Sequence, residues 1–377
     1  MADEFGNLKI LASRAAAQRI SRRHFLAGSA VAVFSGSVLL AACGGEGEAL
    51  NIYNWAEYND PEIFTRFTDE VGPTTEVSIY DSNEQAVAKL QSSEGTSGYD
   101  IVVPSDVYVT QMIELDLLEP LDHSKLPNFD NVETQYRDQP FDPGNEYSVC
   151  KDWGSTGWIV DTQAVSEPIT SWKDFQTAAM GPASGNTSVL DTPGYLSAIY
   201  LWAEGLDWVT EDTAELDAAE DFIVNQFAQH IKAFDSYPGI SLAQGNYALS
   251  QVWNGDARQG LLSVDDPDRY QWSIGTPEAD IWMDNWCIPK GAPHLEEAHE
   301  WINFIMDPDV SFQDMNYHGY NPGITGIQQR AEEEGLEFLD LIFFDEQTVA
   351  GLQPNALNSG QDRRVAIWEA AKAAAGI

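Results

Sequence analysis

Basic residues are scarce in this chain. Its 377 residues include 19 Lys and Arg against 60 Asp and Glu, and the formal net charge at pH 7 is −41. This balance excludes a nucleic-acid partner, because phosphate binding needs clustered Lys and Arg. It also disfavours docking of the folded body on anionic lipid. An acid-rich surface keeps a protein soluble as well, so bulk charge alone does not locate a site.

The motifs of common catalytic and metal sites are also missing. The sequence holds no phosphate-binding G-x-x-x-x-G-K-[ST] or G-x-G-x-x-G loop and no G-x-S-x-G nucleophile elbow. The six histidines have no H-E-x-x-H or zinc-finger spacing, and the acidic segment 265–268 lacks the glycine of a calcium loop. We therefore expect no catalytic residue, no metal and no cofactor.

The N-terminal 43 residues differ from the rest of the chain. Arg22 and Arg23 precede a short apolar run at 27–42, which glycine and serine interrupt. A basic flank, a short apolar run and small residues before a cleavage site are typical of an export signal, and the run is shorter than a spanning helix requires. The paired arginines predict a twin-arginine signal over 1–42.

The apolar run ends in a sequence that resembles the lipoprotein box of bacteria, Leu40-Ala41-Ala42-Cys43. Cleavage before Cys43 would leave it as a lipidated N-terminus, with residues 43–49 as a flexible tether. A plain signal anchor with an incidental cysteine is the alternative. The lipid would hold the folded body to the membrane, outside the cytoplasm. Because disulfides persist there, Cys150 and Cys287 form either one bridge or two buried free thiols.

Beyond residue 49, strand-like and helix-like segments alternate. The predicted strands are 50–53, 75–80, 99–105, 157–160, 247–253 and 282–289. The predicted helices are 61–71, 84–90, 172–178, 195–204, 213–234, 295–306 and 363–374. This alternation indicates an α/β fold with mainly parallel strands, and the chain length favours two domains.

Aromatic residues stand beside acids and turn residues at predicted strand ends. Five such clusters lie at 54–58, 104–108, 252–256, 282–284 and 319–322. Ligands of open α/β sheets bind at the carboxyl ends of strands, and a box of aromatic faces favours alkylammonium groups by about 0.5–2 kcal/mol per contact. A carboxylate such as Asp284 would supply the charge that a desolvated ammonium needs. Core packing and stacking of sugar rings are the alternative uses of these aromatics.

These segments, taken in order, resemble the spermidine/putrescine-binding proteins of bacterial ABC importers. The resemblance covers nearly all of residues 50–330. It is carried by Ile-Tyr-Asn-Trp-Ala-Glu-Tyr at 52–58, Tyr-Asp-Ser-Asn-Glu at 80–84, Tyr-Asp-Ile-Val-Val-Pro-Ser at 99–105, Pro-Phe-Asp-Pro at 140–143, Trp-Gly-Ser-Thr at 153–156, Val-Trp-Asn-Gly at 252–255, Trp-Met-Asp at 282–284, Ile-Asn-Phe at 302–304 and Pro-Asp-Val at 308–310.

The resemblance implies a two-lobed periplasmic-binding-protein fold of type II, in which the chain crosses between the lobes twice. Lobe 1 would comprise 50–150 and 286–328, and lobe 2 would comprise 151–285 and 329–377. The crossings would fall near Cys150 and Cys287, so a bridge across the hinge is one expectation. By the same resemblance the chain is a monomeric receptor, not an enzyme. It would hand a polyamine, putrescine or spermidine, to a membrane permease.

The family's ligand contacts carry over residue by residue. Asp284 would anchor one ammonium group, and Glu57 would help at the other end. Trp253 would pack along the methylene chain of the ligand. The residues expected to bind the ligand are Trp55, Glu57, Tyr58, Ser105, Tyr108, Trp253, Trp282, Asp284 and Tyr320.

The chain departs from the family pattern at several of these positions. Thr192 and Tyr195 stand where second-lobe acids are common, which leaves the role of Asp191 open, and Lys151 stands at a crossing. A lysine in the cleft would repel a polyamine unless it points away or pairs with Asp152. A second hypothesis is therefore a different amine or a zwitterionic, amino-acid-like ligand, whose carboxylate Lys151 would meet.

Overall fold

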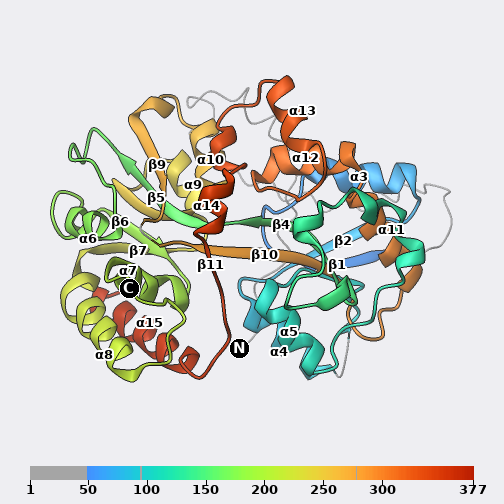
Figure 1. Ribbon diagram of the computed structural model, residues 1–377, viewed down its shortest axis with the longest axis horizontal. Coiled ribbons are helices and arrows are strands. Elements are labelled where there is room, and N and C mark those ends of the chain that lie inside the picture. The colour runs from blue at the N-terminus through green and yellow to red at the C-terminus, as the bar shows by residue number, and fades with distance from the viewer. Residues whose placement is uncertain (1–48, 94–95, 277) are drawn as a thin grey trace, which may run out of the picture.

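The computed structural model describes residues 49–93, 96–276 and 278–377, and it has two lobes joined by extended strands (Figure 1). Each lobe contains one β-sheet with helices packed against it. The α/β class and the two-lobed architecture expected from the sequence are therefore confirmed.

The predicted N-terminal features fall almost wholly outside the described residues. They are the export signal at 1–42, the lipidated Cys43 and the tether at 43–49, of which residue 49 alone is described. Within the described ranges, every helix is too short or too polar to span a lipid bilayer.

The first sheet contains six strands. They are β1 (Leu50–Asn54), β2 (Thr75–Ile79), β3 (Ile101–Val102), β4 (Ser148–Gly154), β10 (Asp280–Cys287) and β11 (Gln353–Pro354). The order is β11-β10-β3-β1-β2, with β4 paired to β10 beside this path. Because β2 and β3 both run parallel to β1, the carboxyl ends of all three strands meet at one edge.

The second sheet contains five strands in the order β7-β6-β8-β5-β9. They are β5 (Thr156–Asp161), β6 (Thr187–Leu190), β7 (Ile231–Asp235), β8 (Leu249–Trp253) and β9 (Tyr270–Ile274). Strands β7 and β8 run parallel to β6, so their carboxyl ends also share an edge. The chain passes from the first sheet to the second at Ser155 and returns between β9 and β10. The residue boundaries expected for the two lobes remain a prediction.

Helices cover both sheets. Those after β1, β2 and β3 are α3 (Pro61–Glu70), α4 (Asn83–Ser92) and α5 (Asp106–Glu114). The second sheet is followed or flanked by α6 (Trp172–Met180), α7 (Pro193–Ala203), α8 (Thr213–Phe222), α9 (Pro238–Ala243) and α10 (Asn254–Ser263). After β10 come α11 (Leu295–Ile305), α12 (Pro308–His318), α13 (Ile327–Glu333), α14 (Glu346–Ala350) and α15 (Gln361–Ala375). Near the C-terminus, α15 packs on α7.

Helix α3 illustrates why the local sequence folds as it does. The Asp60 side chain caps the helix by accepting from the Glu62 N–H at 3.0 Å, and Pro61 occupies the first turn, where its missing N–H costs nothing. Ile63 and Phe67 lie one helical turn apart and are fully buried. The helix therefore starts as predicted and presents its apolar face to the first lobe.

The predicted helix 213–234 is wrong over its second half. Helix α8 ends at Phe222, short π and 3-10 turns follow, and residues 231–235 form β7 beside β6. A short apolar run that continues a helical pattern is ambiguous from periodicity alone. Here the parallel ladder to β6 supplies the backbone hydrogen bonds that decide for a strand.

Much of the tryptophan content belongs to the core. Trp153, Trp286 and Trp301 are buried in the main apolar cluster of the first lobe. The corresponding cluster of the second lobe contains Trp158, Trp172 and Trp202. These six tryptophans belong to the core, and the site must be built from other aromatics.

The disulfide alternative is wrong for this structure. Cys150 and Cys287 are both free and buried. In the β4–β10 ladder Cys150 lies opposite Asn285 and Cys287 lies opposite Ser148, so the two cysteines are not cross-strand partners. They also pack in different apolar clusters, which leaves two buried thiols.

Candidate functional site

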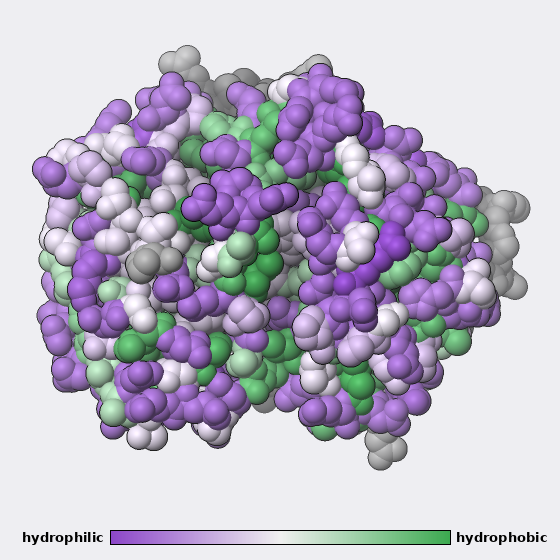
Figure 2. All heavy atoms as spheres, in the orientation of Figure 1, coloured by the Kyte–Doolittle hydropathy of each residue, from purple (hydrophilic) through white to green (hydrophobic). Residues whose placement is uncertain are grey.

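A cavity of about 420 Å³ lies between the two sheets. Its walls include the segments that follow β1, β2 and β3 in the first lobe and β6, β7 and β8 in the second. Figure 2 shows hydrophobic side chains gathered in the hollow between the two halves of the molecule. Both sets of carboxyl strand ends therefore face one space, which is where an open α/β sheet binds its ligand.

All nine residues predicted to bind the ligand line this cavity. They are Trp55, Glu57, Tyr58, Ser105, Tyr108, Trp253, Trp282, Asp284 and Tyr320. The sequence separates the first of them from the last by more than 260 positions. The fold brings them together because the strand ends of both lobes converge.

The aromatic side chains that line the cavity pack against one another. The Tyr320 ring packs against two others: its centroid lies 4.9 Å from that of Trp282 and 5.9 Å from that of Tyr58, both in edge-to-face geometry. On the second-lobe side Trp253 meets Tyr195 edge to face at 6.0 Å. Such pairs contribute about 0.5–1.5 kcal/mol beyond area burial. The rings therefore support one another, and they present faces and edges to the cavity.

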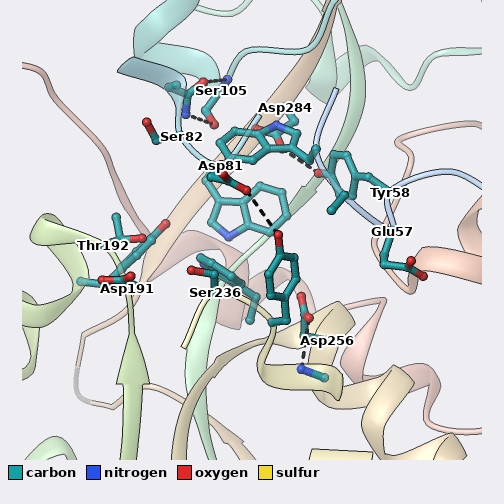
Figure 3. Close-up of a pocket in the computed structure, with 18 of the residues that line it drawn as sticks. Glu57, Tyr58, Asp81, Ser82, Ser105, Asp191, Thr192, Ser236, Asp256 and Asp284 are labelled. Carbon is teal, nitrogen blue, oxygen red and sulfur yellow. Dashed lines mark hydrogen bonds between the residues drawn. The ribbon is translucent and has the colours of Figure 1, made fainter. Parts of the chain in front are cut away.

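Asp284 is a buried acid of the cavity. It lies on β10 and is 6% exposed, and its Oδ2 lies 2.7 Å from the Tyr58 hydroxyl (Figure 3). Its Oδ1 makes no hydrogen bond of good geometry among the described residues, although the Ser105 hydroxyl lies near enough to oppose the rise in the pKa of the carboxyl group. Burial, and then the nearby carboxylate of Asp152, raise the pKa of Asp284 to about 7. A buried acceptor without a partner is costly, and an ammonium group would satisfy it.

An ion pair lies behind this wall. Lys151 Nζ is 2.6 Å from Oδ2 of Asp152 and 3.6 Å from the centre of the Tyr58 ring, and Lys151 is only 4% exposed. His318 Nε2 lies 3.6 Å from both Asp152 and Asp314. Lys151 does not line the cavity. The lysine therefore pairs with Asp152 and does not point at a ligand, so it would meet no ligand carboxylate.

Glu57 takes a less central position than the prediction gave it. Its side chain is exposed and accepts from the Tyr317 hydroxyl at 2.9 Å. Figure 3 shows its carboxylate on the far side of Tyr58 from Asp284. Glu57 thus belongs to the rim of the cavity.

Sequence reasoning missed several acids of the first-lobe wall. Asp106, at the start of α5, is 7% exposed and lines the cavity, and burial raises its pKa to about 7. Asp81 and Glu84 follow β2 and accept from the hydroxyls of Tyr237 (3.3 Å) and Tyr108 (2.6 Å). The sequence signal for these acids is their position directly after predicted strands.

The second-lobe wall carries a different balance of charge. Asp191 is paired with Lys372 at 2.6 Å and accepts from Trp368 Nε1 at 2.9 Å, so its charge is largely compensated. Arg364 also lines the cavity and is 1% exposed. It donates to the carbonyl of Thr210 and forms no ion pair within the described residues. The first-lobe wall is therefore the acidic one.

Tyr237 and Tyr320 connect the lobes across the cavity. The Tyr237 hydroxyl reaches Asp81 from the second lobe, and the Tyr320 hydroxyl donates to Asp256 from the first.

Among the described residues, no group of three or more His, Cys, Asp or Glu side chains is arranged to hold a metal ion. The cavity offers a carboxylate and aromatic faces, and these suit an organic cation.

Known proteins resemble the chain over most of its length. Residues 62–335 match the family described as bacterial extracellular solute-binding protein. The spermidine/putrescine-binding periplasmic protein of Escherichia coli (strain K12) is 33% identical over 304 residues, which cover 79% of this chain and 83% of that protein.

Solved structures agree with this relationship. One is PotD, the spermidine/putrescine ABC transporter substrate-binding protein of Streptococcus pneumoniae, with a TM-score of 0.72, 26% identity, and coverage of 87% of this chain and 100% of that chain. Another is the TpPotD lipoprotein of Treponema pallidum, with a TM-score of 0.74, 25% identity, and coverage of 86% and 99%.

Proposed function

The chain belongs to the family of bacterial extracellular solute-binding proteins, and from that premise we propose that it captures a polyamine, putrescine or spermidine, for an ABC importer. The ligand binds in the cavity between the lobes. Relatives whose names state spermidine or putrescine binding support this assignment. The protein binds its ligand and releases it unchanged.

The observation that carries the proposal is the free oxygen of a buried carboxyl group inside an aromatic cavity. Asp284 Oδ1 makes no hydrogen bond of good geometry within the described ranges, and the rings of Tyr58, Trp282 and Tyr320 line the same cavity. An ammonium group bonded to Oδ1 replaces its lost hydration with a charge-assisted hydrogen bond, and the rings cover the methylene chain. Asp106 is the second buried acid available to an ammonium.

Calorimetric titration of the purified receptor tests the proposal. Putrescine and spermidine should bind one to one, whereas neutral diols of the same length should bind far more weakly, because a hydroxyl brings no positive charge to the carboxylate. Recovery of unmodified putrescine after long incubation is expected as well, since no bond changes. Titrations in which neither amine binds would overturn the proposal.

A second candidate ligand is an amine whose far end carries no positive charge. The observation that favours it is Arg364, a buried cation on the second-lobe wall with no ion pair among the described residues. Compensation of Asp191 by Lys372 removes a further attraction for a second ammonium there. Binding of 4-aminobutyrate or a mono-acetylated diamine more tightly than putrescine would decide for this candidate.

The same proposal covers the cellular setting. The protein is exported by the signal at 1–42 and held at the membrane by a lipid on Cys43, outside the cytoplasm. The TpPotD relative, whose name states that it is a lipoprotein, supports this anchor. The receptor acts as a monomer and delivers its ligand to a membrane permease. Labelling with radioactive fatty acid, present in the natural chain and absent in Cys43→Ser, tests the anchor.

A further inference from the structure

Three oxygen atoms in a row link the cavity to the ion pair behind it. The Tyr58 hydroxyl lies 2.7 Å from Oδ2 of Asp284 and also contacts Oδ1 of Asp152. The other oxygen of Asp152 lies 2.6 Å from Lys151 Nζ. All four side chains are buried. Because neighbouring oxygens in the row lie at hydrogen-bond distance, no water fits between them, and the hydrogens between them belong to these side chains.

The row contains two contacts between oxygens, but Tyr58 carries one hydroxyl hydrogen. If both acids were ionised, one contact would join two lone pairs across a hydrogen-bond distance. A second hydrogen must then sit on one of the carboxyl groups. Burial raises the pKa of Asp152 as it does that of Asp284, but the ammonium of Lys151 lies 2.6 Å from Asp152 and opposes that rise, whereas Asp284 makes no ion pair within the described residues. The second hydrogen belongs on Asp284.

The other groups around Asp284 favour the same arrangement. Asp106 on α5 is an acid whose pKa burial raises to about 7, and Tyr80 and Cys150 are neutral because burial raises the pKa of each well above its ordinary value. His318 on α12 is neutral too, because burial and then Lys151 lower its pKa well below the usual range. None of these groups supplies a positive charge that would keep Asp284 ionised in the empty cavity.

We propose that Lys151 is a positioning residue for ligand capture: acting through Asp152 and Tyr58, it keeps a proton on Asp284 in the ligand-free protein, and an ammonium ligand binds with release of that proton. The inference rests on the proposed function, since it needs an ammonium at Asp284. On binding, the O–H bond of Asp284 breaks, its electron pair stays on the carboxylate, and the proton passes to solvent. The new carboxylate then pairs with the ligand.

Proton release has a definite effect on affinity. At pH values where the free protein holds the proton and the complex does not, affinity rises up to about tenfold per pH unit. It levels off once Asp284 is ionised in the free protein as well. Putrescine keeps both of its charges over this range, so the ligand itself contributes no such dependence.

The experiment is titration calorimetry of putrescine in buffers that differ in ionisation enthalpy. At pH 6 the slope of observed heat against buffer enthalpy should give one proton released from Asp284, or two where the second ammonium also pairs with Asp106, and at pH 8.5 a value close to zero. Binding at pH 6 without proton release overturns the inference and leaves the proposed function intact. Absence of amine binding in every buffer overturns both.

Replacing Lys151 separates positioning from a merely structural role. In Lys151→Met, Asp152 loses its cation and becomes the group that holds the second hydrogen, so Asp284 is already ionised. Proton release at pH 6 should fall by about one proton relative to the natural protein, and Lys151→Arg should restore it. Weaker binding with unchanged proton release would mean that Lys151 only supports the fold, and would refute the proposal.

The chain offers a matched control and a measurement that needs no change at Lys151. Lys290→Met breaks the exposed Lys290–Asp116 pair, 3.0 Å long, and should leave proton release unchanged. In infrared difference spectra of the natural protein with carbon-13-labelled aspartate, saturating putrescine should remove the C=O band of a protonated carboxylic acid. Persistence of every such band in the complex would contradict the proposal even if Lys151→Met fails to fold.

Discussion

Replacement of Asp284 by asparagine removes the charge of the site with little change in shape. A unit charge pair about 4 Å apart is worth roughly 4 kcal/mol at an effective dielectric of about 20. Because Asp284 is 6% exposed, salt screens this interaction little. Part of the energy offsets the desolvation that raises the pKa of the carboxyl group to about 7. The net loss for Asp284→Asn should be about 2–4 kcal/mol, a 30- to 1000-fold weaker affinity.

The assay is calorimetric titration of putrescine at pH 8, where Asp284 of the natural protein is ionised. Asp116→Asn is the control, because Asp116 is an exposed acid of the first lobe that does not line the cavity, and its affinity should stay within about twofold of the natural protein. Asp284→Asn should also melt no lower than the natural protein when both are ligand-free at pH 8, since it removes a buried charge that burial disfavours. A variant that binds within threefold of the natural protein would refute the reasoning.

The remaining predictions concern the cavity wall, pH and the anchor. A Cβ on Gly255 would meet the Tyr320 ring at 2.5 Å, so Gly255→Ala should displace that ring and weaken putrescine binding about tenfold, as calorimetry would measure; unchanged affinity would contradict the packing. The raised pKa values of Asp284 and Asp106, about 7 each, mean that the folded state binds more protons than the unfolded state between pH 4 and 7. The melting temperature of the ligand-free protein should therefore fall as pH rises through this window, and a rise there would be incompatible with two buried neutral acids. Cys43→Ser should move the protein from the membrane to the soluble extracytoplasmic fraction, and retention at the membrane would exclude lipid anchoring through Cys43.

The sequence predicted the parts of the site that depend on chain-local signals. The cluster at 54–58 follows a short strand, and the cluster at 252–256 follows another, so the strand-end rule places both at the ligand edge. Trp55 and Trp253 line the cavity as that rule requires. Alternation of strands and helices likewise predicted the α/β class, because its periodicity is readable from a single chain.

Features set by three-dimensional neighbours could not be predicted. Residues 231–235 become β7 because β6 offers a pairing edge, and no local pattern records that partner. The two thiols stay apart because the ladder register offsets Cys150 from Cys287. Lys151 does not repel a cationic ligand, because its ammonium pairs with Asp152. The β4–β10 ladder has a register shift opposite these residues, which lets the side chains of two consecutive residues meet. Spacing along the chain leaves all three outcomes open.

The most direct test of the account is the identity of the small molecule that the receptor takes up from its own cells. The protein, purified without denaturation from its native membrane, should release putrescine or spermidine on unfolding, detected by mass spectrometry in a ratio near one per chain. Asp284→Asn prepared in parallel should carry little or none. Recovery of an anionic or neutral solute at that ratio, with no amine, would contradict the claim that this cavity holds an organic cation.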